Sequence, residues 1–256
     1  MGINNQKFWI FLLLAACYVF SGCRAKQAAK LTPETPPNMV FIKGGTFQMG
    51  TEDGMPFEGP VHSVEVSGFY IDEAEVTVAQ FEEFVKLTGY KTEAEKFGWS
   101  GVFDMETREW TRTDGADWRH PEGPKSVAQP NEPVCQISWN DASEYAKWAG
   151  KRLPTEAEFE FAARGGLVGK KYAWGDDLMP NGKPIANWWQ GTFPEDNLGL
   201  DGFIGRAPVR SFPANGYGVY DMTGNVWEWC ADRFADDYYE TSPNIIRKGP
   251  RKGMNE

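Results

Sequence analysis

The sequence predicts a mixed α+β domain that is rich in loops and poor in regular structure. Composition is the first reason: 14% of the 256 residues are aromatic, 11 are Trp and 28 are Gly, a mixture typical of irregular backbone held by large buried rings. The second is that every segment with a regular hydrophobic pattern is short, and the third is the absence of any sustained period over residues 90–135. The length favours one large domain. The formal net charge of -10 argues against a nucleic-acid partner.

The first part of this domain predicts short strands and one helix. Apolar alternation broken by a pair of glycines indicates two small strands around a tight turn within residues 39–51. Residues 61–71 alternate again and predict one further strand. A helix follows, with Thr77 as its N-cap and Gly89 at its end. Its buried stripe is expected to be Val78, Phe81, Phe84 and Val85.

Two more helices are expected near the middle of the chain. Residues 138–150 favour a helix that ends at Gly150 and buries Ala142, Tyr145, Ala146 and Ala149. Thr155 and Glu158 have the spacing of a capping box, so another helix is expected to begin there. Arg152 is expected to pair with Glu156 or Glu158. Residues 90–135 are interpreted as a long, ordered, functional loop region, and the chain beyond residue 166 as loops and short strands.

The N-terminus predicts an export signal. Lys7 precedes an apolar run over residues 8–20, which is of signal-peptide length. The run ends in Phe20-Ser21-Gly22-Cys23, which resembles a bacterial lipobox and implies cleavage before Cys23 and lipid attachment to it. Residues 1–22 would then be the signal and residues 23–37 a lipidated, flexible tether. The expected location is the cell envelope, anchored in a membrane and facing the periplasm or exterior; an ordinary secretory signal with an incidental cysteine is the alternative.

Few side chains in the mature part suit soft-metal or redox chemistry. Only Cys135 and Cys230 remain beyond the signal and Cys23, and their apolar surroundings favour two buried free thiols over a disulfide. Only His62 and His120 are present, which argues against a three-histidine iron site. His120 is expected to be a satisfied structural group, with a hydrogen bond to a substrate peptide as the alternative. Trp227 and Trp229 are expected in the core, because alternate positions of an extended segment face one side.

Four ordered segments carry a family resemblance. They are residues 39–50 (MVFIKGGTFQMG), 116–124 (ADWRHPEGP) with Ser126, 134–166, and 215–229 (NGYGVYDMTGNVWEW). The chain resembles the formylglycine-generating, or sulfatase-modifying factor, family over roughly residues 39–235. The resemblance implies the fold of that family, a variant of the C-type-lectin-like architecture, for a domain over residues 38–256.

Two calcium sites are also implied by the resemblance. One set would be the side chains of Asp221 and Glu228 with the carbonyls of Gly224 and Val226. The other would be the side chains of Asn187 and Asp201 with the carbonyls of Trp188 and Phe203. The first set has a chemical basis of its own, because calcium takes six to eight hard oxygens from carboxylates and carbonyls on sharply turning loops. The alternative is that these acids cap turns and pair with arginines. A structural role is expected for both ions.

The activity implied by the resemblance is oxidation of a cysteine in an unfolded sulfatase segment to formylglycine. Enzymes of the family use O2 and copper held by two thiolates in a C-terminal segment. Residues 243–256 contain no such pair, and neither Cys135 nor Cys230 matches its positions, so no catalytic residue is assigned. Two explanations stay open: a truncated or frameshifted gene model of an oxidase, or a natural protein without catalysis. A non-catalytic scaffold lipoprotein of the same fold, of the secretion or gliding type, is the alternative function.

Overall fold

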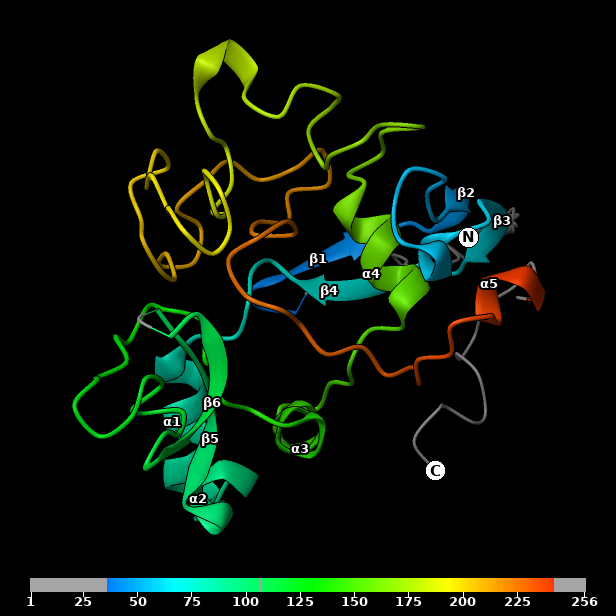
Figure 1. The fold of residues 1–256 in the computed structure, drawn as a ribbon. Helices are drawn as coiled ribbons and strands as arrows, with labels where there is room; N and C mark the ends of the chain where they lie inside the picture. Colours follow the sequence, from blue (N-terminus) through cyan, green and yellow to red (C-terminus); the bar gives the residue numbers. More distant parts are fainter. Residues whose placement is uncertain (1–35, 106, 242–256) are drawn as a thin grey trace, which may run out of the picture. The chain divides into compact units, whose positions relative to one another are not determined.

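The computed structural model of the chain describes residues 36–105 and 107–241 (Figure 1). The predicted signal, the predicted lipid at Cys23 and residues 243–256 lie outside these ranges. None of the helices within them combines the length and the apolar character that crossing a membrane requires.

Four short strands form two small antiparallel sheets. Strand β1 (Met39–Ile42) pairs with β4 (Phe69–Asp72), and β2 (Gly45–Met49) pairs with β3 (His62–Val66). The predicted turn lies between β1 and β2, where a Cβ on Gly44 would lie 2.3 Å from the Val66 carbonyl oxygen. The prediction of a single strand over residues 61–71 was wrong. The chain passes from one sheet to the other at Ser67 and Gly68. The apolar alternation of the sequence continues through this point, so it does not reveal that the neighbouring strand changes.

A helix and a hairpin occupy part of the region predicted as a long loop. Helix α2 (Glu93–Phe97) precedes strands β5 (Trp99–Asp104) and β6 (Glu109–Asp114), which pair with each other. The helix has a capping box from Thr92 to Glu95, the same spacing that predicts the start of a helix at Thr155. The hairpin was missed because it has no buried residue on either strand, so its sequence shows no regular alternation. Residues 115–135 are loop, as predicted.

The other predicted helices are confirmed. Helix α1 (Val78–Thr88) begins at the N-cap Thr77 and ends at Gly89, whose φ is +69°. Helices α3 (Trp139–Trp148) and α4 (Glu156–Ala163) begin with capping boxes from Ser138 and Thr155. Helices α1 and α3 contribute to one buried cluster together with a loop tryptophan; its members are Val78, Phe81, Phe84, Trp118 and Tyr145.

A second buried cluster joins the two sheets to α4, which lies against β2 and β3 (Figure 1). Its members are Ile42, Met49, Val64, Val66, Phe69, Ala157, Phe161, Ala162, Val219 and Tyr239. Tyr239 belongs to the short helix α5 (Tyr238–Thr241), and short 3-10 turns lie at η1 (Pro56–Glu58) and η2 (Pro180–Gly182). Residues 164–237 contain no strand, so the short strands expected there were not found. Hydrogen bonds to regular elements hold these loops in place; for example, Asn215 Nδ2 donates to the Ala162 carbonyl at 2.7 Å.

Candidate metal-binding loops

Residues 221–228 form a tight loop that requires unusual backbone conformations. Asp221, Gly224 and Asn225 have φ angles of +55°, +84° and +60°. A Cβ on Gly224 would lie 2.0 Å from the carbonyl oxygen of Asn187, so no larger residue fits there. The loop is therefore packed directly on a residue of the other predicted calcium set.

Asn225 connects this loop to three other segments. Its Nδ2 donates to Glu75 Oε2 at 2.8 Å and to the Ala207 carbonyl at 3.2 Å. Its Oδ1 accepts from the Ala207 amide at 2.8 Å and from Asn187 Nδ2 at 2.9 Å. The Asn225 amide donates to the Asn187 carbonyl at 2.8 Å. A short polar side chain tolerates a positive φ, and here it also holds the loop in place.

Glu75 brings a third carboxylate to the loop, which the sequence did not predict. The residue is only 7% exposed, and its Oε1 is buried without a hydrogen-bond partner. Burial, followed by the negative charges of Glu228 and Asp221, raises the pKa of Glu75 to about 9. A buried carboxyl group beside two others is a source of strong electrostatic repulsion unless a cation or protons compensate it.

The two predicted carboxylate ligands of the loop also have raised pKa values. Burial raises the pKa of Asp221, whose Oδ2 accepts from the Arg210 amide at 2.6 Å. Desolvation and the charges of Asp221 and Asp72 raise the pKa of Glu228 to about 7, although the residue as a whole keeps an exposed surface.

The second predicted set also lies in one loop unit. The carboxylate of Asp201 accepts from the Trp188 amide at 3.1 Å and from the Phe203 amide at 2.9 Å. The Nδ2 of Asn187 donates to the Gly205 carbonyl at 2.8 Å. Gln190, 5% exposed, was not predicted: its Nε2 donates to Asp201 Oδ2 at 2.6 Å and also to the Trp188 carbonyl. Asp201 thus caps its own turn, as the alternative interpretation expected. Its carboxylate also contacts the backbone of Trp188 and Phe203, two other residues of the predicted set.

Neither set is a metal site made of side chains alone. Within the part of the chain that the structure describes, no three His, Cys, Asp or Glu side chains are grouped closely enough to hold a metal ion. Carbonyl oxygens would have to complete each coordination sphere, as the predicted sets already require. The oxygen donors of the two predicted sets suit a hard cation such as calcium and not a soft one.

Comparison with known proteins identifies the domain. Residues 25–254 match the Sulfatase-modifying factor enzyme 1-like domain. This chain belongs to the sulfatase-modifying factor family. The formylglycine-generating enzyme of Streptomyces coelicolor is 47% identical over 249 residues, covering 90% of this chain and 79% of the relative. That of Thermomonospora curvata is 50% identical over 238 residues, covering 85% and 78%.

Two further proteins are similar to this chain. The "Inactive C-alpha-formylglycine-generating enzyme 2" of Bos taurus is 49% identical over 217 residues, covering 77% of this chain and 71% of the relative. Among solved structures, PvdO from Pseudomonas aeruginosa superposes with a TM-score of 0.63 at 30% identity, covering 84% of this chain and 78% of PvdO. The predicted family and its loop-rich α+β fold are confirmed.

The two cysteines of this family member in the described ranges do not fit a copper(I) site. Both Cys135 and Cys230 are free, half-buried thiols. Burial raises the pKa of Cys135 to about 11 and that of Cys230 to about 12. Burial disfavours the thiolate form that copper(I) binds, so no step through copper is assigned to these residues.

The prediction that Trp227 and Trp229 lie in the core was wrong. Trp227 is 92% exposed and Trp229 51%. Trp227 stacks on Trp110 of the β5–β6 hairpin, with ring centroids 6.2 Å apart, and Trp229 Nε1 donates to the Ile137 carbonyl at 2.9 Å. A two-residue alternation indicates which side chains share a side of a segment, but not whether that side faces the core.

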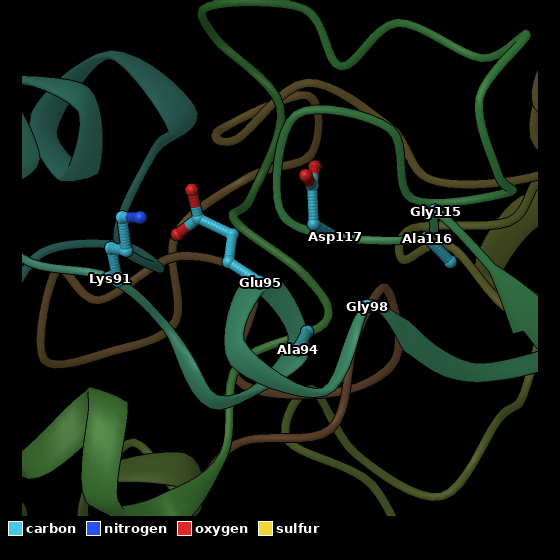
Figure 2. A pocket seen from close by; sticks show the side chains of 7 residues that line it. All are labelled: Lys91, Ala94, Glu95, Gly98, Gly115, Ala116 and Asp117. Atoms are coloured by element: carbon cyan, nitrogen blue, oxygen red, sulfur yellow. The ribbon is translucent and has the colours of Figure 1, made fainter.

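Another cavity lies between α2 and the segment after β6 (Figure 2). It measures about 270 Å³ and is lined by Lys91, Ala94, Glu95, Gly98, Gly115, Ala116 and Asp117. Its carboxylates are bound to the protein: Glu95 accepts from Arg119 Nη1 at 2.9 Å, and Asp117 lies 3.2 Å from His120 Nδ1. His120 is thus the satisfied structural group that was predicted.

Proposed function

We propose that this chain is an envelope lipoprotein that takes part in sulfatase maturation and binds an unfolded sulfatase segment. The observation that carries this proposal is identity of 47–50% to formylglycine-generating enzymes over most of the chain. A form of the protein that carries a copper-binding thiol pair would oxidise the sulfatase cysteine to formylglycine with O2. This chain is expected to bind the segment without converting it, because burial disfavours the thiolate forms of Cys135 and Cys230 that copper(I) would need.

The test uses the full chain in detergent micelles and a peptide with a C-x-P-x-R sequence. With copper(I), O2 and a thiol reductant, mass spectrometry and a hydrazide probe would detect an aldehyde product. The Streptomyces coelicolor enzyme serves as the positive control. We expect peptide binding without aldehyde. Stoichiometric conversion of the peptide would overturn the assignment of the chain as inactive, and failure to bind the peptide would overturn the sulfatase role.

A scaffold function is the second candidate. The inactive relative from Bos taurus, at 49% identity, supports it, because a family member can keep this fold without catalysis. A scaffold would not recognise the C-x-P-x-R sequence. Binding of the peptide and of a version with its Cys, Pro and Arg replaced by Ala therefore separates the two candidates: equal or absent binding favours the scaffold.

Calcium is proposed as a structural ion at both loops. The ligands would be Asp221, Gly224, Val226 and Glu228 in one loop, and Asn187, Trp188, Asp201 and Phe203 in the other. The carboxylates with raised pKa values around the first loop support this assignment, since a cation would compensate their repulsion. Residues 164–237 are almost wholly loop, so an ion there would stabilise backbone that has few regular hydrogen bonds.

The membrane anchor is proposed from sequence alone. Cys23 would carry the lipid and hold the domain at the envelope through the tether of residues 23–37. Cys23→Ser is expected to move the protein from the membrane to the soluble fraction and to abolish incorporation of labelled fatty acid. Retention of both properties would overturn lipidation at Cys23.

A further inference from the structure

The sequence contains two Asn-Gly pairs, Asn181-Gly182 and Asn215-Gly216. Asparagine is a thermolabile residue, because the main-chain nitrogen of the next residue can attack its side-chain amide. Glycine favours this attack, since it has no Cβ beside that nitrogen and adopts many backbone conformations. The two pairs share this local chemistry, so their surroundings in the folded protein decide which of them reacts.

The first pair lies in an exposed turn. Asn181 and Gly182 belong to the 3-10 turn η2, drawn in yellow-green at the tip of a loop (Figure 1). Both residues are exposed, and the Asn181 side chain has no hydrogen-bond partner among the described residues. A Cβ placed on Gly182 would meet no atom within 4 Å. The Asn181 amide can therefore rotate toward the Gly182 nitrogen without displacing a neighbour.

Few interactions keep this turn closed. The Gly182 amide donates to the Met179 carbonyl at 2.8 Å, and the Lys183 amide donates to the Pro180 carbonyl at 3.2 Å. Asn181 itself has a φ of +55°, a conformation that is unfavourable for a residue other than glycine, so opening the turn releases strain. Exposed segments with so few bonds open at little cost. Opening frees the nitrogen of Gly182 for reaction.

The second pair is held in place on both of its residues. The Nδ2 of Asn215 donates to the Ala162 carbonyl at 2.7 Å, and its Oδ1 accepts from the Tyr217 amide at 2.9 Å. A Cβ on Gly216 would lie 2.3 Å from the Gly165 carbonyl oxygen, so the main chain is closely packed there. The amide of Asn215 cannot rotate unless these bonds break and the surrounding loop opens.

We propose that Asn181 is a modification site at which the folded protein deamidates spontaneously through a cyclic imide. The Gly182 nitrogen forms a bond to Cγ of Asn181, and the bond from Cγ to the side-chain nitrogen breaks. That nitrogen leaves as ammonia and takes up the proton of the Gly182 amide. Water then opens the imide at one of its two carbonyl groups, which yields either aspartate or an isoaspartyl linkage. Solvent water is the co-reactant, and no atom is oxidised or reduced.

Both products change the turn. Each adds a negative charge close to Asp177, whose carboxylate already accepts from the Met179 amide at 3.0 Å. The isoaspartyl product also inserts one carbon atom into the main chain, which is incompatible with the hydrogen bond that closes the turn. Because the reaction needs only water, the modified fraction should increase with the age of the folded protein.

The test follows both pairs in the same sample. The full chain in detergent micelles is kept for several weeks at neutral pH in heavy-oxygen water, then digested in ordinary water and analysed by tandem mass spectrometry. Heavy oxygen in the product marks reaction in the folded protein and excludes deamidation during digestion. We expect conversion of Asn181 to two separable products and a rate at Asn215 that is about 10-fold lower or less, because that site must open first.

Two controls make the result decisive. In urea the two pairs should convert at similar rates, since folding no longer protects Asn215. The variant Asn181→Gln should abolish conversion at residue 181, because glutamine forms the corresponding ring far more slowly, and should leave the rate at Asn215 unchanged. Equal rates at Asn181 and Asn215 in the folded chain would overturn the proposal, as would conversion of Asn181 in urea alone.

Discussion

The side-chain amide of Asn187 donates to Oδ1 of Asn225 over 2.9 Å and so joins the two candidate calcium loops directly. The backbone repeats the connection, because the Asn225 amide donates to the Asn187 carbonyl at 2.8 Å. A displacement of either loop therefore moves predicted ligands in both. Loops without regular structure gain rigidity from each other here, and the candidate ions would act on the pair as one unit.

Asn225→Ala should be strongly destabilising, because it removes this connection. The substitution removes the hydrogen bonds that the Asn225 side chain makes with Glu75, Ala207 and Asn187, which should lower the free energy of unfolding by about 3 kcal/mol or more. Urea denaturation gives the value. Asn181→Ala is the control: Asn181 has a similar φ of +55° on an exposed turn, so it loses only about 1 kcal/mol of backbone preference. Equal losses would mean that the Asn225 network contributes nothing.

Calcium removal is predicted to lower the Tm. A ligand that binds only the folded state contributes about 2.7 kcal/mol at 100 times its Kd, which for a domain of this size corresponds to about 5–10 °C. Melting curves in calcium and in chelator measure the difference for the wild type, Asp201→Asn and Glu228→Gln. Each variant should show a smaller calcium response than the wild type. Identical curves for the wild type in calcium and chelator would refute both candidate sites.

The helices were predictable because their signals are local. Thr77, Ser138 and Thr155 each cap a helix through a residue three positions later, and a sequence window of that length contains both partners. Thr92 and Glu95 carry the same signal for α2 but lie in a region without apolar periodicity. The hairpin that follows gives no such signal, because its strands bury no residue.

The candidate site was predictable only in part, because some of its contacts join segments that lie far apart in the sequence. Asp221, Gly224 and Glu228 stand close together in a segment that carries the family resemblance. Glu75 approaches the same loop from a position 150 residues away from Asn225, and no pattern near Glu75 indicates this. Gln190 was also missed. Its role is to donate two hydrogen bonds from its side-chain amide, to the Trp188 carbonyl and to Asp201, and no sequence pattern indicates these bonds. Contacts between distant segments depend on the packing of the whole domain.

Glu158 should make stability depend on pH in the acidic range. Desolvation would raise the pKa of this carboxyl group, but hydrogen bonds from Arg152 and from Thr155 outweigh it, so the folded pKa lies below its ordinary value. The Arg152 guanidinium contacts both oxygens at 2.7 Å. A lowered folded pKa means that the contribution is fully present above the unfolded pKa of about 4.3 and is lost as the pH falls through the folded pKa.

The variant Glu158→Gln tests this contribution. Between about pH 6 and pH 3 it should lose less unfolding free energy than the wild type, since its amide does not titrate. Urea denaturation across this range gives both curves. Thr155→Ala is the companion variant: it removes the N-cap of α4 and should lower stability by about 1 kcal/mol at neutral pH. Parallel pH profiles for Glu158→Gln and the wild type would contradict the assigned role.

The thiols of Cys135 and Cys230 should react slowly in the folded protein. Burial raises their pKa values to about 11 and about 12, so at neutral pH the thiolate, which is the nucleophile, is scarce. Cys135 Sγ also lies 3.7 Å from the Pro133 carbonyl as a donor. Iodoacetamide labelling followed by peptide mass spectrometry should show little modification of either residue at pH 7 and rapid modification in urea. Fast labelling of the folded chain would mean that one of these thiols is available as a thiolate, and would reopen it as a copper ligand.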